Sequence, residues 1–116
     1  MKEIITGNGP LEEGPYEFTV IGVPEKHMLP NNGFKRIWNL GYIGKNGETT
    51  KKFHLFGNQY NSIVLAIGGK KVGNDVEWDD EQVEGRTFSC TLKVTKSKDG
   101  KFDNYYFENC QPIVPF

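Results

Sequence analysis

Five segments of the chain have the period-two pattern of β-strands, and only one has the spacing of an amphipathic helix. The clearest strand spans 87–95, where Phe88, Cys90, Leu92 and Val94 alternate with polar residues. The predicted strands are 16–23, 34–43, 50–56, 87–95 and about 102–113. Gly (14 residues) and Pro (6 residues) are placed mainly between these segments, which is typical of a turn-rich β protein.

The helical segment lies between the third and fourth predicted strands. Its apolar residues recur at helical spacing: Tyr60, Ile63, Val64 and Ile67. Asn58 or Gly57 is placed to cap its start, and Gly68-Gly69 is expected to end it. Three strands, one helix and two strands is the element order of an OB-fold. We therefore expect an all-β domain with one helix, a five-stranded Greek-key barrel with the helix between strands 3 and 4.

Turn chemistry divides the chain further. Asn46-Gly47 and Asp99-Gly100 favour tight hairpins, because Asn, Asp and Gly accept positive φ at low cost. Segments 25–33 and 70–84 are predicted to be loops. The expected organisation is an extended N-terminal arm, one OB-fold domain and a short C-terminal tail, at 1–15, 16–113 and 114–116.

Composition narrows the function classes. The 116 residues suit one domain, and 14 Lys plus Arg against 15 Asp plus Glu give a net charge of -1. A protein that neutralises a long duplex is normally more basic, whereas a narrow strand-binding groove needs only local positive charge. No signal peptide and no apolar run of membrane-spanning length is visible in the sequence, so a cytoplasmic location is expected.

Aromatic residues make up 13% of the chain, and several lie among cations on the second and third predicted strands. Bases of unpaired nucleic acid stack on rings, and phosphates attract Lys and Arg. On the third strand, Phe53 and Leu55 share one face, and the other face would make a poor core but a good stacking platform. That platform consists of Lys52, His54 and Phe56. Candidates on the second strand are Phe34, Lys35, Arg36 and Trp38.

Trp38 has two interpretations. If it is exposed, Trp38 and Arg36 extend the stacking platform of the third strand. If it is buried, Trp38, Leu40 and Tyr42 fill the barrel, and Arg36 lies at the rim. Gly41 could host a bulge that switches the faces partway along the strand.

The last hairpin supplies further candidates for phosphate and base contacts. Tyr105 and Tyr106 are adjacent, so alternation sends them to opposite faces. Lysines surround them and could hold a nucleic-acid backbone electrostatically, although hairpin tips are often Lys-rich for solubility. These lysines are Lys93, Lys96, Lys98 and Lys101.

Other chemistry is weakly supported. The acidic run 77–81 lacks the ligand spacing of a calcium loop, and the two Cys and two His lack zinc-finger spacing. A two-residue turn at Asp99-Gly100 places Cys90 opposite Asn109, with Cys110 on the other face unless a bulge shifts the register. No phosphate loop, serine elbow or paired-carboxylate site is apparent, so neither an enzyme nor a cofactor is expected.

Several segments together resemble small phage- and prophage-type single-stranded DNA-binding proteins built on an OB-fold. They are Gly14-Pro15-Tyr16-Glu17-Phe18-Thr19-Val20, Arg36-Ile37-Trp38-Asn39-Leu40, Val83-Glu84-Gly85-Arg86-Thr87-Phe88 and Asn104-Tyr105-Tyr106-Phe107-Glu108-Asn109. The resemblance covers about 14–113 and lies in the order of the elements and in these short segments. It implies binding of unpaired DNA during replication, recombination or repair, with a homodimer and replication or recombination proteins as further partners.

The C-terminal end departs from the bacterial members of that class, which carry a disordered tail with an acidic run and a Pro-Phe tip. This chain ends Pro115-Phe116 but has neither the acidic run nor a linker. Two alternatives stay open: an OB-like adaptor that binds another protein, and a protein that binds single-stranded RNA.

Overall fold

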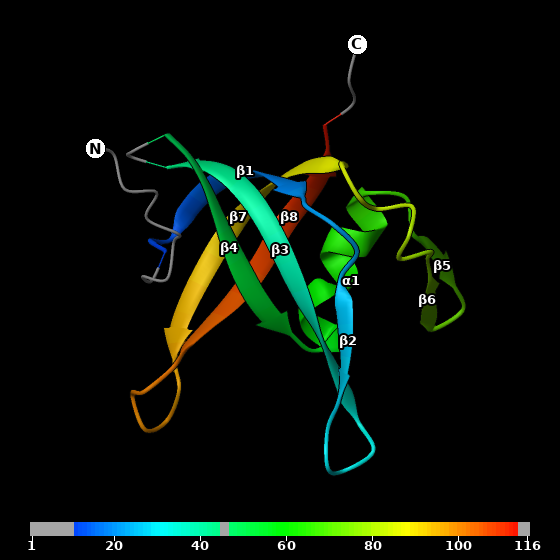
Figure 1. Cartoon of the computed structure of the whole chain (residues 1–116), viewed down its shortest axis with the longest axis horizontal. Helices are drawn as coiled ribbons and strands as arrows, with labels where there is room; N and C mark the ends of the chain where they lie inside the picture. Colours follow the sequence, from blue (N-terminus) through cyan, green and yellow to red (C-terminus); the bar gives the residue numbers. More distant parts are fainter. Residues whose placement is uncertain (1–10, 45–46, 114–116) are drawn as a thin grey trace.

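The computed structural model describes residues 11–44 and 47–113, and these residues form a mostly β structure with a single helix (Figure 1). Most of the predicted arm, Lys45 and Asn46 of the predicted turn, and the tail 114–116 lie outside the described residues. No described helix combines the length and the apolar character needed to cross a membrane.

Antiparallel pairing joins six strands into one curved sheet, in the order β2-β3-β1-β7-β8 with β4 also paired to β3. The strands are β1 (Gly14–Val20), β2 (Glu25–Met28), β3 (Phe34–Gly44), β4 (Gly47–Leu55), β7 (Thr87–Lys96) and β8 (Asp103–Pro112). Figure 1 shows β3 and β4 crossing in front of β7 and β8. A separate hairpin consists of β5 (Lys70–Val72) and β6 (Asp75–Glu77).

The expectation that 25–33 and 70–84 are loops is wrong in part. β2 lies in the first segment and the β5–β6 hairpin in the second. All four β2 residues are exposed, so the segment lacks the apolar alternation by which strands are predicted from sequence. β2 follows β1 along the same edge of β3, after a break at Gly22 (φ 74°) and Pro24.

The single helix, α1 (Gly57–Ala66), lies between β4 and β5 in the sequence. Its N-cap is Phe56, one residue before the predicted Gly57, and the Gln59 side chain accepts the Phe56 backbone N–H at 2.9 Å. The helix ends before Gly68 (φ 122°), and the N–H of Gly69 bonds the carbonyl of Val64 at 2.7 Å.

Aromatic side chains dominate the core between the curved sheet and α1. The Phe18 ring lies within 6 Å of the Phe53, Phe88 and Phe107 rings. The largest fully buried side chains are Trp38, Phe18, Phe53, Phe88, Leu40, Leu55, Ile63 and Leu92. Edge and tilted ring contacts of this kind add to the free energy of burial.

β7 and β8 pair with the register expected from the Asp99-Gly100 turn until a bulge interrupts it near Cys90. Thr91 faces Glu108, but Ser89 faces Gln111, so one extra residue is accommodated on β8. Asn109 has φ 53°, a left-handed conformation that Asn accepts more readily than most residues.

The sheet is not closed into a barrel by strand pairing among the described residues. No ladder joins β4 to β8, the strands that would complete the circle. Side chains span this gap instead: the Phe53 ring lies 5.2 Å from the Tyr105 ring and 5.3 Å from the Phe107 ring. We refer to this β4–β8 gap, bridged by Phe53, Tyr105 and Phe107, as the seam.

Candidate nucleic-acid interface

The outward face of β2, β3 and β4 gathers cationic and titratable side chains from three strands. Strand register sets His27 opposite Lys35 and, two positions along β3, Ile37 opposite His54. The next outward position on β3, Asn39, faces Lys52. Since outward positions recur every second residue, these side chains share one surface. We call His27, Lys35, Lys52 and His54 the cationic face.

The electrostatics of His54 show that these groups lie close together. Its pKa is lowered by burial first, and then by the charges of Lys35, His27 and Lys52. The side chain of His27 also contacts a carboxylate, with Nε2 3.1 Å from Glu25 Oε2. An anion bound here would relieve the repulsion among the cations, which makes the face suited to phosphate.

Phe56 extends the outward series of β4 beyond the end of the strand. Its backbone is extended (φ −90°, ψ 166°), and its ring is 47% exposed. The predicted platform of Lys52, His54 and Phe56 is therefore exposed at all three positions, while Phe53 and Leu55 are buried.

Phe34 and Lys35 point to opposite faces of the β2–β3 hairpin. The Phe34 ring is 39% exposed, and the Lys26 ammonium lies 4.3 Å from its centroid. Met28, the register partner of Phe34, is 67% exposed. Phe34 thus lies with Lys26 on one side of the hairpin, and His27 and Lys35 lie on the other.

Trp38 and Arg36 do not belong to an exposed platform, which corrects one of the two interpretations of the sequence. Trp38 is fully buried, stacked at 5.6 Å on Trp78 and packed against Tyr60 of α1. The Arg36 guanidinium donates through Nη1 to the Pro24 carbonyl and to Asp80 Oδ2, both at 3.0 Å. The strand face that bears both residues turns inward, against the helix and the 78–84 segment.

On the last hairpin, Lys93 pairs with Tyr106 on the outward face, and the Tyr106 side chain is 41% exposed. Tyr105 points inward at the seam, where its hydroxyl accepts the Leu11 backbone N–H at 3.2 Å. Lys51 lies over the Tyr105 ring at 5.7 Å, and burial lowers the Lys51 pKa.

Phe102 is an exposed ring that the sequence analysis did not include among the site residues. It is 67% exposed and follows Lys101 in the tight turn of the β7–β8 hairpin. Ser97 and Asp99 fix this turn: the Ser97 hydroxyl donates to Asp99 Oδ1 at 2.6 Å, which lowers the Asp99 pKa. In the sequence Phe102 begins the predicted strand 102–113, and the available signal was a ring directly after Lys101.

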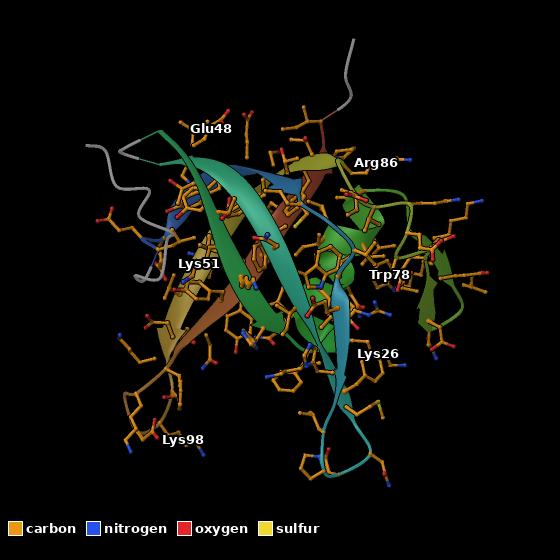
Figure 2. All side chains as sticks on the ribbon, viewed as in Figure 1. Lys26, Glu48, Lys51, Trp78, Arg86 and Lys98 are labelled. Carbon is orange, nitrogen blue, oxygen red and sulfur yellow. The ribbon has the colours of Figure 1, made fainter. Side chains whose placement is uncertain are left out.

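Two hairpins, β2–β3 and β7–β8, project toward the same side of the molecule (Figure 1). Lys26 lies on the first and Lys98 at the tip of the second (Figure 2). The cationic face is thus carried by strands that continue into one of these projections. The exposed candidate residues lie on several strands and do not converge on one pocket.

A separate open hollow of about 620 Å³ is lined by both signs of charge, including Arg36, Lys70, Glu77 and Asp80. Across 11–44 and 47–113, no three His, Cys, Asp or Glu side chains gather in a way that could hold a metal ion.

The chain matches no protein-family profile, and comparison with curated proteins gives no significant match.

Proposed function

We propose that the protein binds single-stranded DNA without catalysis and with little sequence preference. The observation that carries this proposal is the cationic face, whose four side chains come from three neighbouring strands and share one surface. Burial and then the nearby Lys35, His27 and Lys52 lower the pKa of His54 within it. Phe56 adjoins this face, and the exposed rings Phe34, Phe102 and Tyr106 on the two hairpins would supply further stacking surfaces. Each stacked base would contribute about 1–3 kcal/mol, and the lysines would neutralise phosphates.

The strand pairing supports an OB-type framework as part of this proposal. β1 pairs with β3 and β7, β3 with β4, and β7 with β8, a meander joined through β1 to a second hairpin, as in five-stranded OB barrels. α1 precedes β7 as the helix of that fold precedes its fourth strand. In this interpretation β2 is an extension of the first strand, and the seam takes the place of the closing ladder.

The biological setting is also proposed, from the resemblance to phage-type proteins. Unpaired DNA arises during replication, recombination and repair, so the protein would coat such DNA in the cytoplasm of a bacterium or of a phage-infected cell. Homodimers and replication or recombination proteins are the partners that this role would require.

Fluorescence anisotropy with labelled oligo-dT tests the proposal directly, with duplex DNA and oligo-rU of matched length as competitors. The double variant Lys35→Ala/Lys52→Ala should weaken oligo-dT binding at least about tenfold, because it removes two phosphate partners. Lys70→Ala/Lys71→Ala on the β5–β6 hairpin is the matched control, with the same loss of charge away from the cationic face.

Equal affinity of both double variants for oligo-dT would contradict the assignment of the site. Absence of saturable oligo-dT binding by the wild-type chain would contradict the function. Stronger competition by oligo-rU than by oligo-dT would instead favour RNA as the ligand, since a ribose 2′-hydroxyl would then add contacts.

A second function, protein recognition through a sheet edge, is favoured by β2. This strand ends the pairing order of the sheet, and all its residues are exposed. An extended peptide could add to its outer edge by main-chain hydrogen bonds. Binding partners lost on Met28→Pro, with oligo-dT affinity retained, would distinguish this role, because Leu29 bonds Gly33 of the hairpin and the alternating Met28 N–H therefore faces the outer edge of β2.

A further inference from the structure

The two cysteines of the chain, Cys90 on β7 and Cys110 on β8, face the same side of the sheet because of the bulge. Without it, Cys90 would lie opposite Asn109, and Cys110 would point the other way. The register shift between Ser89 and Thr91 places both Asn109 and Cys110 across from Cys90. The left-handed backbone of Asn109 (φ 53°) absorbs the extra residue.

The thiols are within reach of each other. Each thiol is the main influence on the other: Cys90 lowers the pKa of Cys110, and Cys110 raises the pKa of Cys90. The Cys110 thiol also donates to the Phe107 carbonyl oxygen at 3.6 Å. Both cysteines are free thiols in the structure. Adjacent thiols on neighbouring strands are the arrangement from which a cross-strand disulfide forms with little backbone movement.

The two thiols differ in access. Cys90 is buried (5% exposed), whereas Cys110 is half-buried. Because Cys110 is the more exposed of the two thiols, it is the one expected to react first with a small disulfide molecule.

We propose that Cys90 and Cys110 form a reversible intramolecular disulfide across the β7–β8 bulge, with Cys110 as the attacking and Cys90 as the resolving thiol. The Cys110 thiolate attacks one sulfur of a low-molecular-weight disulfide, forms a mixed disulfide and releases one small thiolate. Cys90 then loses its proton and attacks Cys110 Sγ, which releases the second small thiolate. The protein pair is oxidised by two electrons, and the small disulfide is reduced to two thiols.

Oxidised glutathione added to the reduced full-length chain tests the proposal. Intact mass after acid quenching should show a monomer that has lost one hydrogen atom from each thiol, with no retained glutathione. Peptide mapping without reductant should link the peptides that contain Cys90 and Cys110, and thiol reductant should reverse the change. The oxidised form should also melt higher, by on the order of 5 °C, because the cross-link restricts the unfolded chain.

Two variants distinguish the roles of the thiols. In Cys90→Ala, Cys110 should accumulate a stable glutathione adduct, because no resolving thiol remains. In Cys110→Ala, the buried Cys90 should react much more slowly. A lasting glutathione adduct on the wild-type chain, a disulfide between two chains, or unreactive thiols would overturn the proposal. The wild-type result decides even if a variant does not fold.

Discussion

Individual side chains on β3 and β4 lie in two environments that a shift of one position would exchange. Trp38 and Phe53 point inward as register partners, and their neighbours Asn39 and Lys52 point outward as the next pair. Ring type alone does not assign an aromatic residue to the core or to a ligand surface. Phe56 is four positions after the outward Lys52, so alternation places its ring outward and exposed. Trp38 occupies an inward position of β3 and is buried.

Trp38→Ala should therefore act on stability and Phe56→Ala on binding. Emptying the Trp38 site removes contacts with Tyr60 and Trp78 and should cost about 3–5 kcal/mol of unfolding free energy. Phe56→Ala should change stability by about 0.5 kcal/mol or less. Urea unfolding followed by circular dichroism measures both. A destabilisation of Phe56→Ala equal to that of Trp38→Ala would show that Phe56 is packed.

His54 gives binding a defined pH dependence. Burial and the neighbouring Lys35, His27 and Lys52 hold its pKa below 6.5 in the free protein, and bound phosphate would raise it. Binding then takes up a proton, so oligo-dT affinity should increase as the pH falls from about 8 to about 5.5. In the free protein the same lowered pKa makes folding less favourable as the pH falls below 6.5.

Anisotropy titrations across this pH range, with His54→Gln as the comparison, measure the effect. The variant should have a shallower dependence of oligo-dT affinity on pH than the wild type. Identical pH profiles for wild type and His54→Gln would show that the bound oligo-dT does not interact with His54.

At the scale of elements, irregularities in the strands decide which side chains meet. The break at Gly22 and Pro24 redirects the chain so that β2 pairs with the first half of β3, beyond the part paired with β1. The bulge at Asn109 brings Cys110 to the side of Cys90. Each feature depends on one or two residues whose backbone preferences differ from those of ordinary strand residues.

Asn109 tests how strongly the bulge depends on its backbone conformation. Asn109→Val should lower the unfolding free energy by about 1–2 kcal/mol, because a β-branched residue is strained at φ 53°. Asn109→Gly should be nearly neutral, since glycine adopts this region freely. Thermal unfolding of the wild type, Asn109→Val and Asn109→Gly gives the order of their stabilities. Equal melting temperatures for Val and Gly would mean that the bulge relaxes when the side chain changes.

The sequence was sufficient to predict the strands and the helix wherever apolar periodicity is strong, as in 87–95 and 60–67. It was insufficient for β2, whose four exposed residues pair only because the neighbouring strand extends past the core. The inward position of Trp38 depends on register with β4, which alternation along β3 alone leaves open. The bulge likewise depends on a backbone angle at Asn109 that its amino-acid type permits but does not require.

At the scale of the whole molecule, the near-neutral net charge of -1 conceals local separation of charge. The acidic 77–81 segment adjoins the hollow beside α1, whereas Lys35 and Lys52 lie on the cationic face. Lys98 and Lys101 add positive charge to the exposed turn of the β7–β8 hairpin. Carboxylates lie beside these cations as well, since Glu25 contacts His27 and Asp99 lies in the same turn as Lys98 and Lys101.

Salt dependence of binding reports how many of these cations neutralise phosphates. If Lys35, Lys52, Lys98 and Lys101 each contact one phosphate, log K should fall against log salt concentration with a slope of about −3 for a single strand. Lys98→Ala/Lys101→Ala should make that slope shallower by about 1.4. Titrations at a series of salt concentrations supply both values. A slope near zero for the wild type would contradict electrostatic binding.

At the seam, the described residues of β4 and β8 are held together by side chains and not by backbone hydrogen bonds. Among the described residues no backbone ladder joins β4 to β8, and side chains link the two strands, including Phe53 with Tyr105 and Phe107 and Lys51 with Tyr105. A fully hydrogen-bonded barrel has a circumference fixed by its strand number and stagger. Because this sheet, as far as the structure describes it, has no ladder between β4 and β8, we expect these two edges to separate at lower cost than any pair of hydrogen-bonded strands.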